Sequence, residues 1–535
     1  MTVADEIAKT LAAYGVRFAF GIPGNDVLEL IRACEDEGIR FVLAKSEPSA
    51  AFMADAVFHL TGAPAALIAA LGPGIANAIS GLAGAAQERS AMVVLTGEMA
   101  SAQAGIYTHQ VFDHVALAAP VTKYAAALNP ARAAQQVAKA LDIALSHPPG
   151  PVMLNIAADH SRAEARGAAS FVPARRLPAV PREAEFARVR QTLDRAERPL
   201  ALVGLGALRG GAPQAAAAFL RGRGLPFLAT YKAKGVVPED DPLCLGALGL
   251  SPVVDAENLR LVADADLIVL IGFDPIELRD AWLDAWGADK ACISLDWGSI
   301  GHRVFPVGEE ALGDLPAILA ALTGQPRPLA WPAERLRAHR DAVAAIVRPR
   351  DPAGAISPAA LFHAVSRRIR EDWTLTVDVG AHRILADHVI ACRTPGQLLQ
   401  SNGLGHMGCA VPYAIAAQLL RPDHTVVALV GDGCLLMALG DLALAAELGL
   451  PLVVVVLNDA ALSLIKLKQR KMQLAPRAVD FASPRFDILG QGFGAVAKSA
   501  RSLAAFEVAF DEAVASRRLT LIDASVDPAE YLEQM

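Results

Sequence analysis

The chain has 535 residues, which is more than one hydrophobic core usually organises and predicts about three domains. Its net charge of −7, with no basic run interleaved with aromatic residues, argues against a nucleic-acid partner. No apolar stretch is long and uninterrupted enough to span a membrane, and the first residues lack a signal-peptide pattern. Six scattered cysteines without a CxxC pair predict reduced thiols, so we expect a cytoplasmic protein with a small-molecule substrate.

Residues 1–165 alternate helical patterns with short apolar runs, which predicts a parallel sheet covered by helices. The predicted strands are 18–21, 41–44, 65–69, 92–96 and 152–156. Glu47 follows the second of these strands and opens a helical segment. Gly72-Pro73-Gly74 follows the third strand and opens another helix, which carries Asn77.

A second alternating segment covers 190–325, with predicted strands at 200–204, 226–229, 267–271 and 292–295. Gly204-Leu205-Gly206 follows its first strand but does not complete a GxGxxG motif, and the expected acidic residue about 20 positions later is missing. A nicotinamide dinucleotide site is therefore not expected. We interpret 161–185 and 324–358, which are rich in proline, arginine and alanine, as linkers.

A third segment covers 355–535, with predicted strands at 374–377, 425–430, 452–457 and 519–524. The sequence therefore predicts an α/β protein made of three consecutive open parallel-sheet domains flanked by helices. The expected boundaries of these domains are 1–165, 190–325 and 355–535.

The most specific motif lies in the third segment, where Gly431-Asp432-Gly433 is followed after 24 residues (434–457) by Asn458-Asp459. A buried strand, a glycine turn and a helix start follow one another at Asp432, so backbone N–H groups can approach a phosphate. Asp459 follows the next predicted strand, at the sheet edge where ligands of such folds bind. Oxygen ligands from two strand ends suit magnesium, and we expect a magnesium-diphosphate site here.

This spacing resembles the signature of thiamine-diphosphate enzymes. The three successive domains resemble the acetolactate synthase, benzoylformate decarboxylase and pyruvate oxidase group over nearly the whole chain, and the pattern is most similar to acetolactate synthase large subunits. The resemblance implies thiamine diphosphate and magnesium as cofactors. It also implies a homodimer or homotetramer, because in this group the first and third domains that hold the cofactor come from different subunits.

Residue by residue, the resemblance implies metal ligation by the side chains of Asp432 and Asp459 and by the backbone carbonyl of Ala461. Asp459 stands where the family usually has asparagine. Glu47 matches the glutamate that activates the cofactor by facing its pyrimidine ring. The further matches to cofactor-binding positions are Gly431, Gly433, Gly380, His382, Asn77, Gly405 and Met407, the last two in a loop (401–408) that bends the cofactor. His382 could instead be a solvated loop histidine.

On the substrate side, Gln110 matches a family glutamine that faces the substrate, and His109 replaces a phenylalanine. A histidine there could act as an acid or base near neutral pH, or could pack as a neutral ring. In the middle segment, Gly272-Phe273-Asp274-Pro275 departs from the segment of FAD-binding relatives, which argues against FAD.

The resemblance implies a carboligase or lyase that acts on 2-oxo acids through a carbanion-enamine intermediate, as acetolactate synthases do. A 2-oxo-acid decarboxylase that releases an aldehyde is the alternative, and His109 is the residue that favours it. A non-enzymatic regulatory relative is the remaining alternative, which the presence of Glu47 and of the Asp432 motif opposes.

Overall fold

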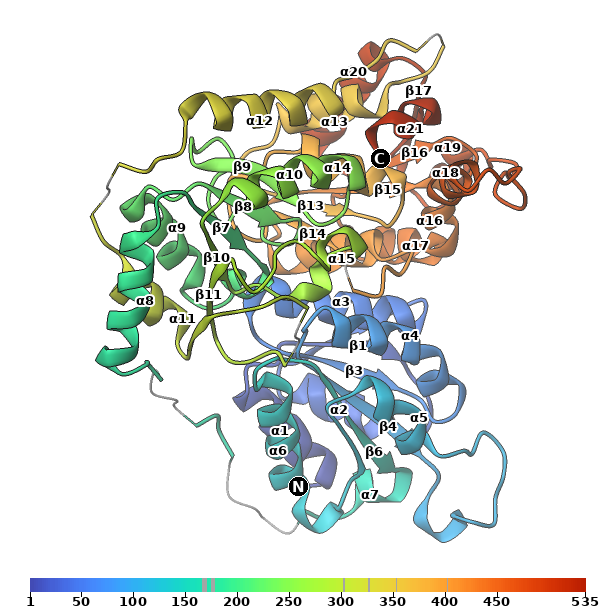
Figure 1. The fold of residues 1–535 in the computed structure, drawn as a ribbon. Coiled ribbons are helices and arrows are strands. Elements are labelled where there is room, and N and C mark those ends of the chain that lie inside the picture. Colours follow the sequence, from blue (N-terminus) through green and yellow to red (C-terminus); the bar gives the residue numbers. More distant parts are fainter. Residues whose placement is uncertain (166–170, 175–178, 302–303, 326–327, 353, 402) are drawn as a thin grey trace. The chain divides into compact units, whose positions relative to one another are not determined.

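The computed structural model describes residues 1–165, 171–174, 179–301, 304–325, 328–352, 354–401 and 403–535. These residues form three sheets of six strands each, in which the paired strands run parallel. Helices flank each sheet, so the predicted fold class is confirmed (Figure 1). By its internal contacts the chain divides into two compact units: 1–176 with 401–423 and 436–450, and 177–400 with 424–435 and 451–535.

The first unit contains the sheet with the order β2-β1-β3-β4-β6-β5. Its strands are β1 (Phe18–Ile22), β2 (Arg40–Leu43), β3 (Ala65–Ala69), β4 (Met92–Glu98), β5 (Tyr124–Ala127) and β6 (Pro151–Ala157). Its helices are α1 (Val3–Ala13), α2 (Leu28–Asp36), α3 (Glu47–Thr61), α4 (Pro73–Gln87), α5 (His114–Ala118), α6 (Ala133–Leu145), α7 (Ala158–Arg162), α15 (Ala410–Leu420) and α17 (Leu439–Glu447). Apolar side chains of α1, α2 and α6 form one core with the sheet, while α3 packs against α4 and α15.

The second unit contains the other two sheets, of which the first has the order β12-β11-β10-β7-β8-β9. Its strands are β7 (Pro199–Val203), β8 (Phe227–Thr230), β9 (Cys244–Leu248), β10 (Leu267–Ile271), β11 (Ala291–Asp296) and β12 (Glu309–Leu312). Its helices are α8 (Glu183–Arg195), α9 (Ala212–Arg223), α10 (Pro252–Asp264), α11 (Leu315–Leu322) and α12 (Ala333–Ile346). Two hydrophobic cores lie on the two faces of this sheet, as expected for parallel strands that are buried on both sides.

The last sheet has the order β14-β13-β15-β16-β18-β17, which repeats the strand order of the first sheet. Its strands are β13 (Trp373–Val377), β14 (Leu398–Gln400), β15 (Thr425–Gly431), β16 (Val453–Asn458), β17 (Val496–Ala500) and β18 (Thr520–Ser525). The accompanying helices are α13 (Pro358–Ser366), α14 (Ala381–Val389), α16 (Asp432–Met437), α18 (Ser463–Lys471), α19 (Phe486–Gly492), α20 (Leu503–Ser516) and α21 (Tyr531–Gln534). In both repeats the chain reverses direction across the sheet beside the first strand, and α/β sheets bind ligands at the carboxyl ends of strands at such a reversal.

Two details differ from the sequence prediction. The segment 324–358, interpreted as a linker, contains the helix α12, which packs against α10. The helix expected after the glycine turn already begins at Asp432, and two helices, α16 and α17, follow there in succession. Part of the other linker, 166–170 and 175–178, lies outside the described residues.

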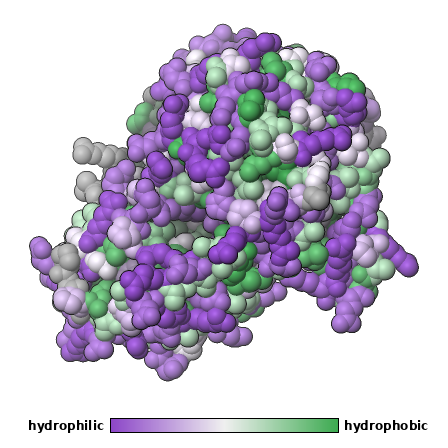
Figure 2. All heavy atoms as spheres, turned by 90° about the horizontal axis from the view of Figure 1, so that it is seen from above, coloured by the Kyte–Doolittle hydropathy of each residue, from purple (hydrophilic) through white to green (hydrophobic). Residues whose placement is uncertain are grey.

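Among the described residues, no helix is both long and apolar enough to cross a membrane. On the face shown in Figure 2, hydrophilic residues predominate and hydrophobic residues occur in scattered groups. The six cysteines are buried free thiols.

A buried ion pair joins two segments of the second unit. Lys234, only 3% exposed at its side chain, donates from Nζ to both carboxylate oxygens of Glu239 at 2.7 and 2.8 Å. Burial opposes the positive charge of Lys234, but the carboxylate of Glu239 outweighs that effect and raises the pKa of the ammonium. Glu239 Oε2 also accepts the N–H of Cys392, so the pair ties the segment after β8 to the segment before β14.

We expect Lys234→Ala to lower the free energy of unfolding by about 3–5 kcal/mol, because it leaves a buried carboxylate without its counter-charge. Urea unfolding of purified protein measures the change. Arg221→Ala is the control, since Arg221 pairs with Asp241 through a side chain that is 54% exposed, and its loss should cost less than about 1 kcal/mol. Equal losses in the two variants would contradict the assignment of a stabilising role to the buried pair.

Candidate functional site

Asp432 lies at the point where β15 ends and α16 begins. Its Oδ2 accepts backbone N–H groups from Asp459 at 3.2 Å and from Ala460 at 2.7 Å, and its Oδ1 accepts the N–H of Gly433 at 2.6 Å. The strands β15 and β16 are paired neighbours, with Gly431 opposite Leu457. The two predicted motif halves, 27 positions apart, therefore meet at the same edge of the sheet.

Asp459 presents the second carboxylate at this edge. Its Oδ1 accepts the N–H of Ala461 at 3.2 Å, and its Oδ2 accepts the hydroxyl of Ser463 at 2.6 Å. Burial, and after it the neighbouring charge of Asp432, raises the pKa of Asp459 to about 7. Burial also raises the pKa of Asp432. A buried carboxylate that raises the pKa of its half-buried neighbour forms an arrangement that a divalent cation would stabilise.

The few oxygen donors at this edge suit magnesium, which binds to a small number of protein ligands, better than a metal whose ligands all come from protein side chains. Among the described residues there is no group of three or more His, Cys, Asp and Glu side chains that could hold a metal. Two carboxylates and one backbone carbonyl, that of Ala461, would leave the remaining positions of an octahedron to diphosphate oxygens and water.

His382 lies in the first turn of α14, beyond the end of β13, with 6% of its surface exposed. A Cβ added at Gly380 would lie 2.6 Å from the imidazole, and one added at Gly431 would lie 3.1 Å from it, so both glycines are needed for the ring to fit. Burial, and then the charge of Arg383, lowers the pKa of His382 to about 3. The imidazole is therefore neutral, and not the solvated loop histidine that the sequence left open.

The Nε2 atom of His382 is buried and has no hydrogen-bond partner among the described residues. Buried polar atoms are normally paired, so an unpaired one beside a helix N-terminus indicates a group supplied by a ligand. Because Gly431 adjoins both His382 and Asp432, the residues of this edge suit a diphosphate with its metal.

Glu47 is the first residue of α3, directly after β2, and 9% of its surface is exposed. The Nδ2 of Asn77 donates to Glu47 Oε2 at 2.6 Å. Asn77 lies on α4, the helix that begins with Pro73, so the two candidate residues are held together by adjacent helices. The sequence placed Asn77 among the cofactor-binding groups and did not anticipate this contact.

The loop that carries His109 and Gln110 packs on the start of α4. Gly72 has a φ of +71°, and a Cβ there would lie 2.7 Å from the Cβ and carbonyl oxygen of Gln110. Gln110 itself has a φ of +61°, which is uncommon for a residue with a side chain. His109 is exposed on this loop, with its ring 6.2 Å from that of Tyr107.

His114 is a residue that the sequence analysis missed. It is 1% exposed, and its Nε2 accepts the N–H of Gly72 at 3.1 Å. Its Nδ1 lies 3.2 Å from Asn155 Oδ1 and 3.3 Å from Glu98 Oε2, both acceptors, so Nδ1 carries the proton. The ring thus links the ends of β4 and β6 to the turn before α4. The sequence signal for this residue was a histidine at the start of an otherwise apolar helix. A buried imidazole there requires hydrogen-bond partners.

A pocket of about 960 Å³ opens at the carboxyl ends of the first sheet. The segments that line it follow β1, β3, β4 and β6, and His109 and Gln110 line it as well. This edge of a parallel sheet is where open α/β folds bind their ligands.

Gly405 and Met407 lie in the segment that precedes α15 and belong to the first unit, as Glu47 does. Gly405 has a φ of +66°, which favours glycine. The ring of His406 lies 4.9 Å from that of Phe52 on α3, so the segment is held against the helix that starts with Glu47. Asn402 of the same motif lies outside the described residues.

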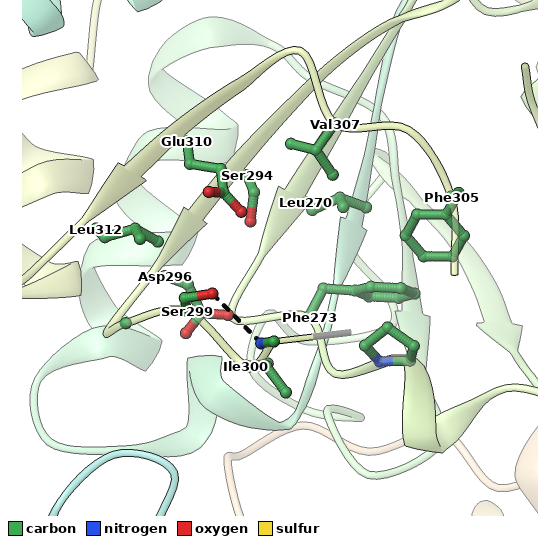
Figure 3. Close-up of a pocket in the computed structure, with 13 residues that line it drawn as sticks. Leu270, Phe273, Ser294, Asp296, Ser299, Ile300, Phe305, Val307, Glu310 and Leu312 are labelled. Carbon is green, nitrogen blue, oxygen red and sulfur yellow. Dashed lines mark hydrogen bonds between the residues drawn. The ribbon is translucent and has the colours of Figure 1, made fainter. Parts of the chain in front are cut away.

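A small cavity of about 60 Å³ lies at the carboxyl ends of β10, β11 and β12 (Figure 3). Phe273 and Phe305 line one side, while Ser294, Asp296 and Glu310 supply polar groups. Burial raises the pKa of Asp296 to about 7. Ligand sites for drug-sized molecules usually measure several hundred Å³, so this cavity is small by comparison.

We expect His114→Phe to lower the free energy of unfolding by about 1–3 kcal/mol, because the buried N–H of Gly72 then loses its acceptor. Urea unfolding measures this loss. His109→Asn on the same loop is the control, and should change stability by less than about 0.5 kcal/mol because the side chain is exposed. A His114→Phe protein as stable as wild type would show that the turn does not need the imidazole.

Three family models match the chain in succession. The N-terminal TPP binding domain of thiamine pyrophosphate enzymes matches residues 1–117, their central domain matches 186–322, and their C-terminal TPP binding domain matches 378–524. TPP, thiamine pyrophosphate, is another name for thiamine diphosphate.

Curated relatives match nearly the whole chain. The acetolactate synthase isozyme 2 large subunit of Escherichia coli is 29% identical, over 99% of this chain and 96% of the relative. The catabolic acetolactate synthase of Raoultella terrigena is 30% identical, over 94% and 91%. A protein of Pseudomonas aeruginosa named "probable 2-ketoarginine decarboxylase" is 30% identical, over 98% and 94%. The chain therefore belongs to the thiamine-diphosphate-dependent enzymes of the acetolactate synthase type, which form or cleave carbon–carbon bonds.

Proposed function

We propose that the protein binds thiamine diphosphate through magnesium and acts on a 2-oxo acid, breaking the bond next to the carbonyl. The observation that carries this proposal is the meeting of the buried carboxylate of Asp432 and the half-buried carboxylate of Asp459 at one sheet edge. Asp432, Asp459 and the carbonyl of Ala461 hold the metal, while Gly431, Gly433, Gly380 and His382 surround the diphosphate. When bound, the thiazolium of the cofactor supplies an electron sink for the broken bond.

Glu47 holds the proton that activates the cofactor. Because its Oε2 accepts a hydrogen bond from Asn77, a neutral Glu47 carries its proton on Oε1. That O–H can donate to a ring nitrogen, while Asn77 fixes the orientation of the carboxyl group. Gly405 and Met407 are the backbone groups that face the same ring in this proposal, and Gln110 and His109 face the substrate.

The favoured reaction is carboligation, in which the fragment left from one 2-oxo acid is passed to a second carbonyl compound. Two of the relatives carry acetolactate synthase names, which supports this choice. The alternative is decarboxylation with release of an aldehyde, supported by the relative named as a decarboxylase and by His109 on the pocket. Incubation with 2-oxo acids, followed by analysis for acetohydroxy acids and for free aldehydes, separates the two.

The remaining features of the proposal concern organisation. We propose functional domains at 1–165, 190–325 and 355–535, a cytoplasmic location, and a homodimer or homotetramer with active sites between subunits. Sedimentation velocity over a range of protein concentrations tests the assembly.

We expect Glu47→Gln to lower turnover of 2-oxo acids by about 10²–10⁴-fold while thiamine diphosphate still binds, because only the activating proton is lost. Carbon dioxide release measures turnover, and calorimetric titration measures binding of the cofactor. Glu35→Gln, an exposed residue of α2, is the matched control and should retain wild-type activity. Full activity of the Glu47→Gln protein would remove Glu47 from this role.

We expect Asp432→Asn to weaken magnesium-dependent binding of thiamine diphosphate by more than about 100-fold, since even residues that only orient a metal ligand contribute 10- to 100-fold. Asparagine retains an oxygen that can accept the loop N–H groups, so the change removes mainly charge. Calorimetric titration of thiamine diphosphate with and without magnesium measures the effect. Unchanged binding would show that the metal lies elsewhere.

A further inference from the structure

The pocket of the first unit contains a carboxylate that the proposed chemistry does not use. Asp26 follows β1 and lines this pocket, although only 9% of its surface is exposed. It lies where the chain reverses across the first sheet, between the end of β1 and the ends of β3 and β4.

The backbone around Asp26 leaves room for this carboxylate and for little else. Asp26 Oδ2 accepts the N–H of Leu71, beyond the end of β3, at 2.8 Å. A Cβ added at Gly97 of β4 would lie 1.5 Å from the same oxygen, and a Cβ added at Gly24 would lie 2.6 Å from Oδ1. The absence of side chains at Gly24 and Gly97 therefore makes room for the Asp26 carboxylate, and the N–H of Leu71 holds it in position.

Asp26 Oδ1, by contrast, accepts no hydrogen bond from the described residues, and Asp26 forms no ion pair with a described basic side chain. A buried carboxylate is costly unless it is paired or hydrogen-bonded. Oδ1, on a carboxylate at the wall of a substrate-sized pocket, is therefore available to a donor on a ligand, and a cationic nitrogen is the donor that a carboxylate binds most strongly.

The other charged groups of the pocket are already engaged. Glu98 accepts the N–H of Met99 at 2.9 Å and the Nδ2 of Asn155 at 2.7 Å. Asp159 Oδ1 accepts the N–H of Ser101 at 2.9 Å. Arg162, with a side chain that is 63% exposed, lies 4.0 Å from Glu29 and is the one arginine or lysine among the described lining residues.

We propose that Asp26 selects substrates whose side chain ends in a positively charged nitrogen, so that the preferred substrate is a 2-oxo acid with a guanidinium or ammonium group. This inference rests on the proposed function, since it assigns the side-chain end of the same substrate. An anionic substrate without such a group would meet a buried negative charge, whereas a cationic nitrogen provides the donor that Oδ1 lacks.

The test compares three 2-oxo acids: 5-guanidino-2-oxopentanoate, 2-oxohexanoate, whose side chain is uncharged, and the dianion 2-oxoglutarate. We expect kcat/KM of wild type to be about 10- to 100-fold higher for the guanidino acid than for 2-oxohexanoate, the range that a charge-assisted hydrogen bond provides. 2-Oxoglutarate should be the poorest of the three. Equal or lower kcat/KM for the guanidino acid would overturn the inference.

Asp26→Asn keeps an oxygen that can accept the N–H of Leu71 and removes the charge. In this variant the preference for the guanidino acid over 2-oxohexanoate, measured as the ratio of the two kcat/KM values, should nearly vanish. Asp36→Asn, the same change at a side chain that is 63% exposed on α2, should keep the wild-type preference. Thermal melting establishes that both variants fold.

A preference that persists in the folded Asp26→Asn protein would also overturn the inference. If cofactor-dependent turnover of 2-oxohexanoate is measured without preference for the cation, the proposed function stands and the role of Asp26 fails. If no 2-oxo acid is turned over, the proposed function fails and this inference fails with it.

Discussion

The candidate chemistry of this protein depends on one constraint, the direction of the parallel strands. In a parallel sheet the carboxyl ends of all strands lie at the same edge. The first and last sheets share one strand order, in which the chain reverses direction across the sheet beside β1 and beside β13. Asp432 and His382 follow strands at one of these reversals, and Asp26 lies at the other. Loops at such edges expose backbone N–H groups, which explains why acids and phosphate-binding turns gather there.

The polar atoms at these edges fall into two classes: those with a hydrogen-bond partner within the described residues, and those without one. Oε2 of Glu47 is paired with Asn77, and the imidazole of His114 is paired on both nitrogens. Nε2 of His382 and Oδ1 of Asp26 have no such partner among the described residues. Nε2 of His382 is buried, so its missing partner is costly and a ligand could supply it, whereas Oδ1 of Asp26 lies on the wall of the pocket. In the same pocket Glu98 differs from Asp26, because both carboxylate oxygens of Glu98 accept hydrogen bonds from the protein.

The sequence predicted the central strands because parallel strands buried on both faces are continuous apolar runs. The strands it missed, namely β5, β9, β12, β14 and β17, all lie at the edges of their sheets. Of these, β5, β12 and β17 are partly exposed, as at Glu309 and Glu310 of β12, and so lack that signal, whereas β9 and β14 are largely buried. The candidate site residues were assigned by resemblance to family motifs, and the structure brings two of them, Asp432 and Asp459, to one sheet edge. The contacts of Asn77 with Glu47 and of His114 with Gly72 were not, because they join residues 30 and 42 positions apart whose meeting depends on helix packing.

The candidate residues also divide between the two compact units. Glu47, Asn77 and the pocket with Asp26 belong to the unit that contains the first sheet, whereas the acid pair at Asp432 and Asp459 belongs to the other. Neither unit alone carries both the proposed activating acid and the proposed metal ligands. If the proposed active sites lie between subunits, binding of the cofactor also stabilises the association of those subunits, and its affinity includes the free energy of that association. This linkage gives a physical reason why active sites between subunits, as proposed for this chain, would couple assembly to activity.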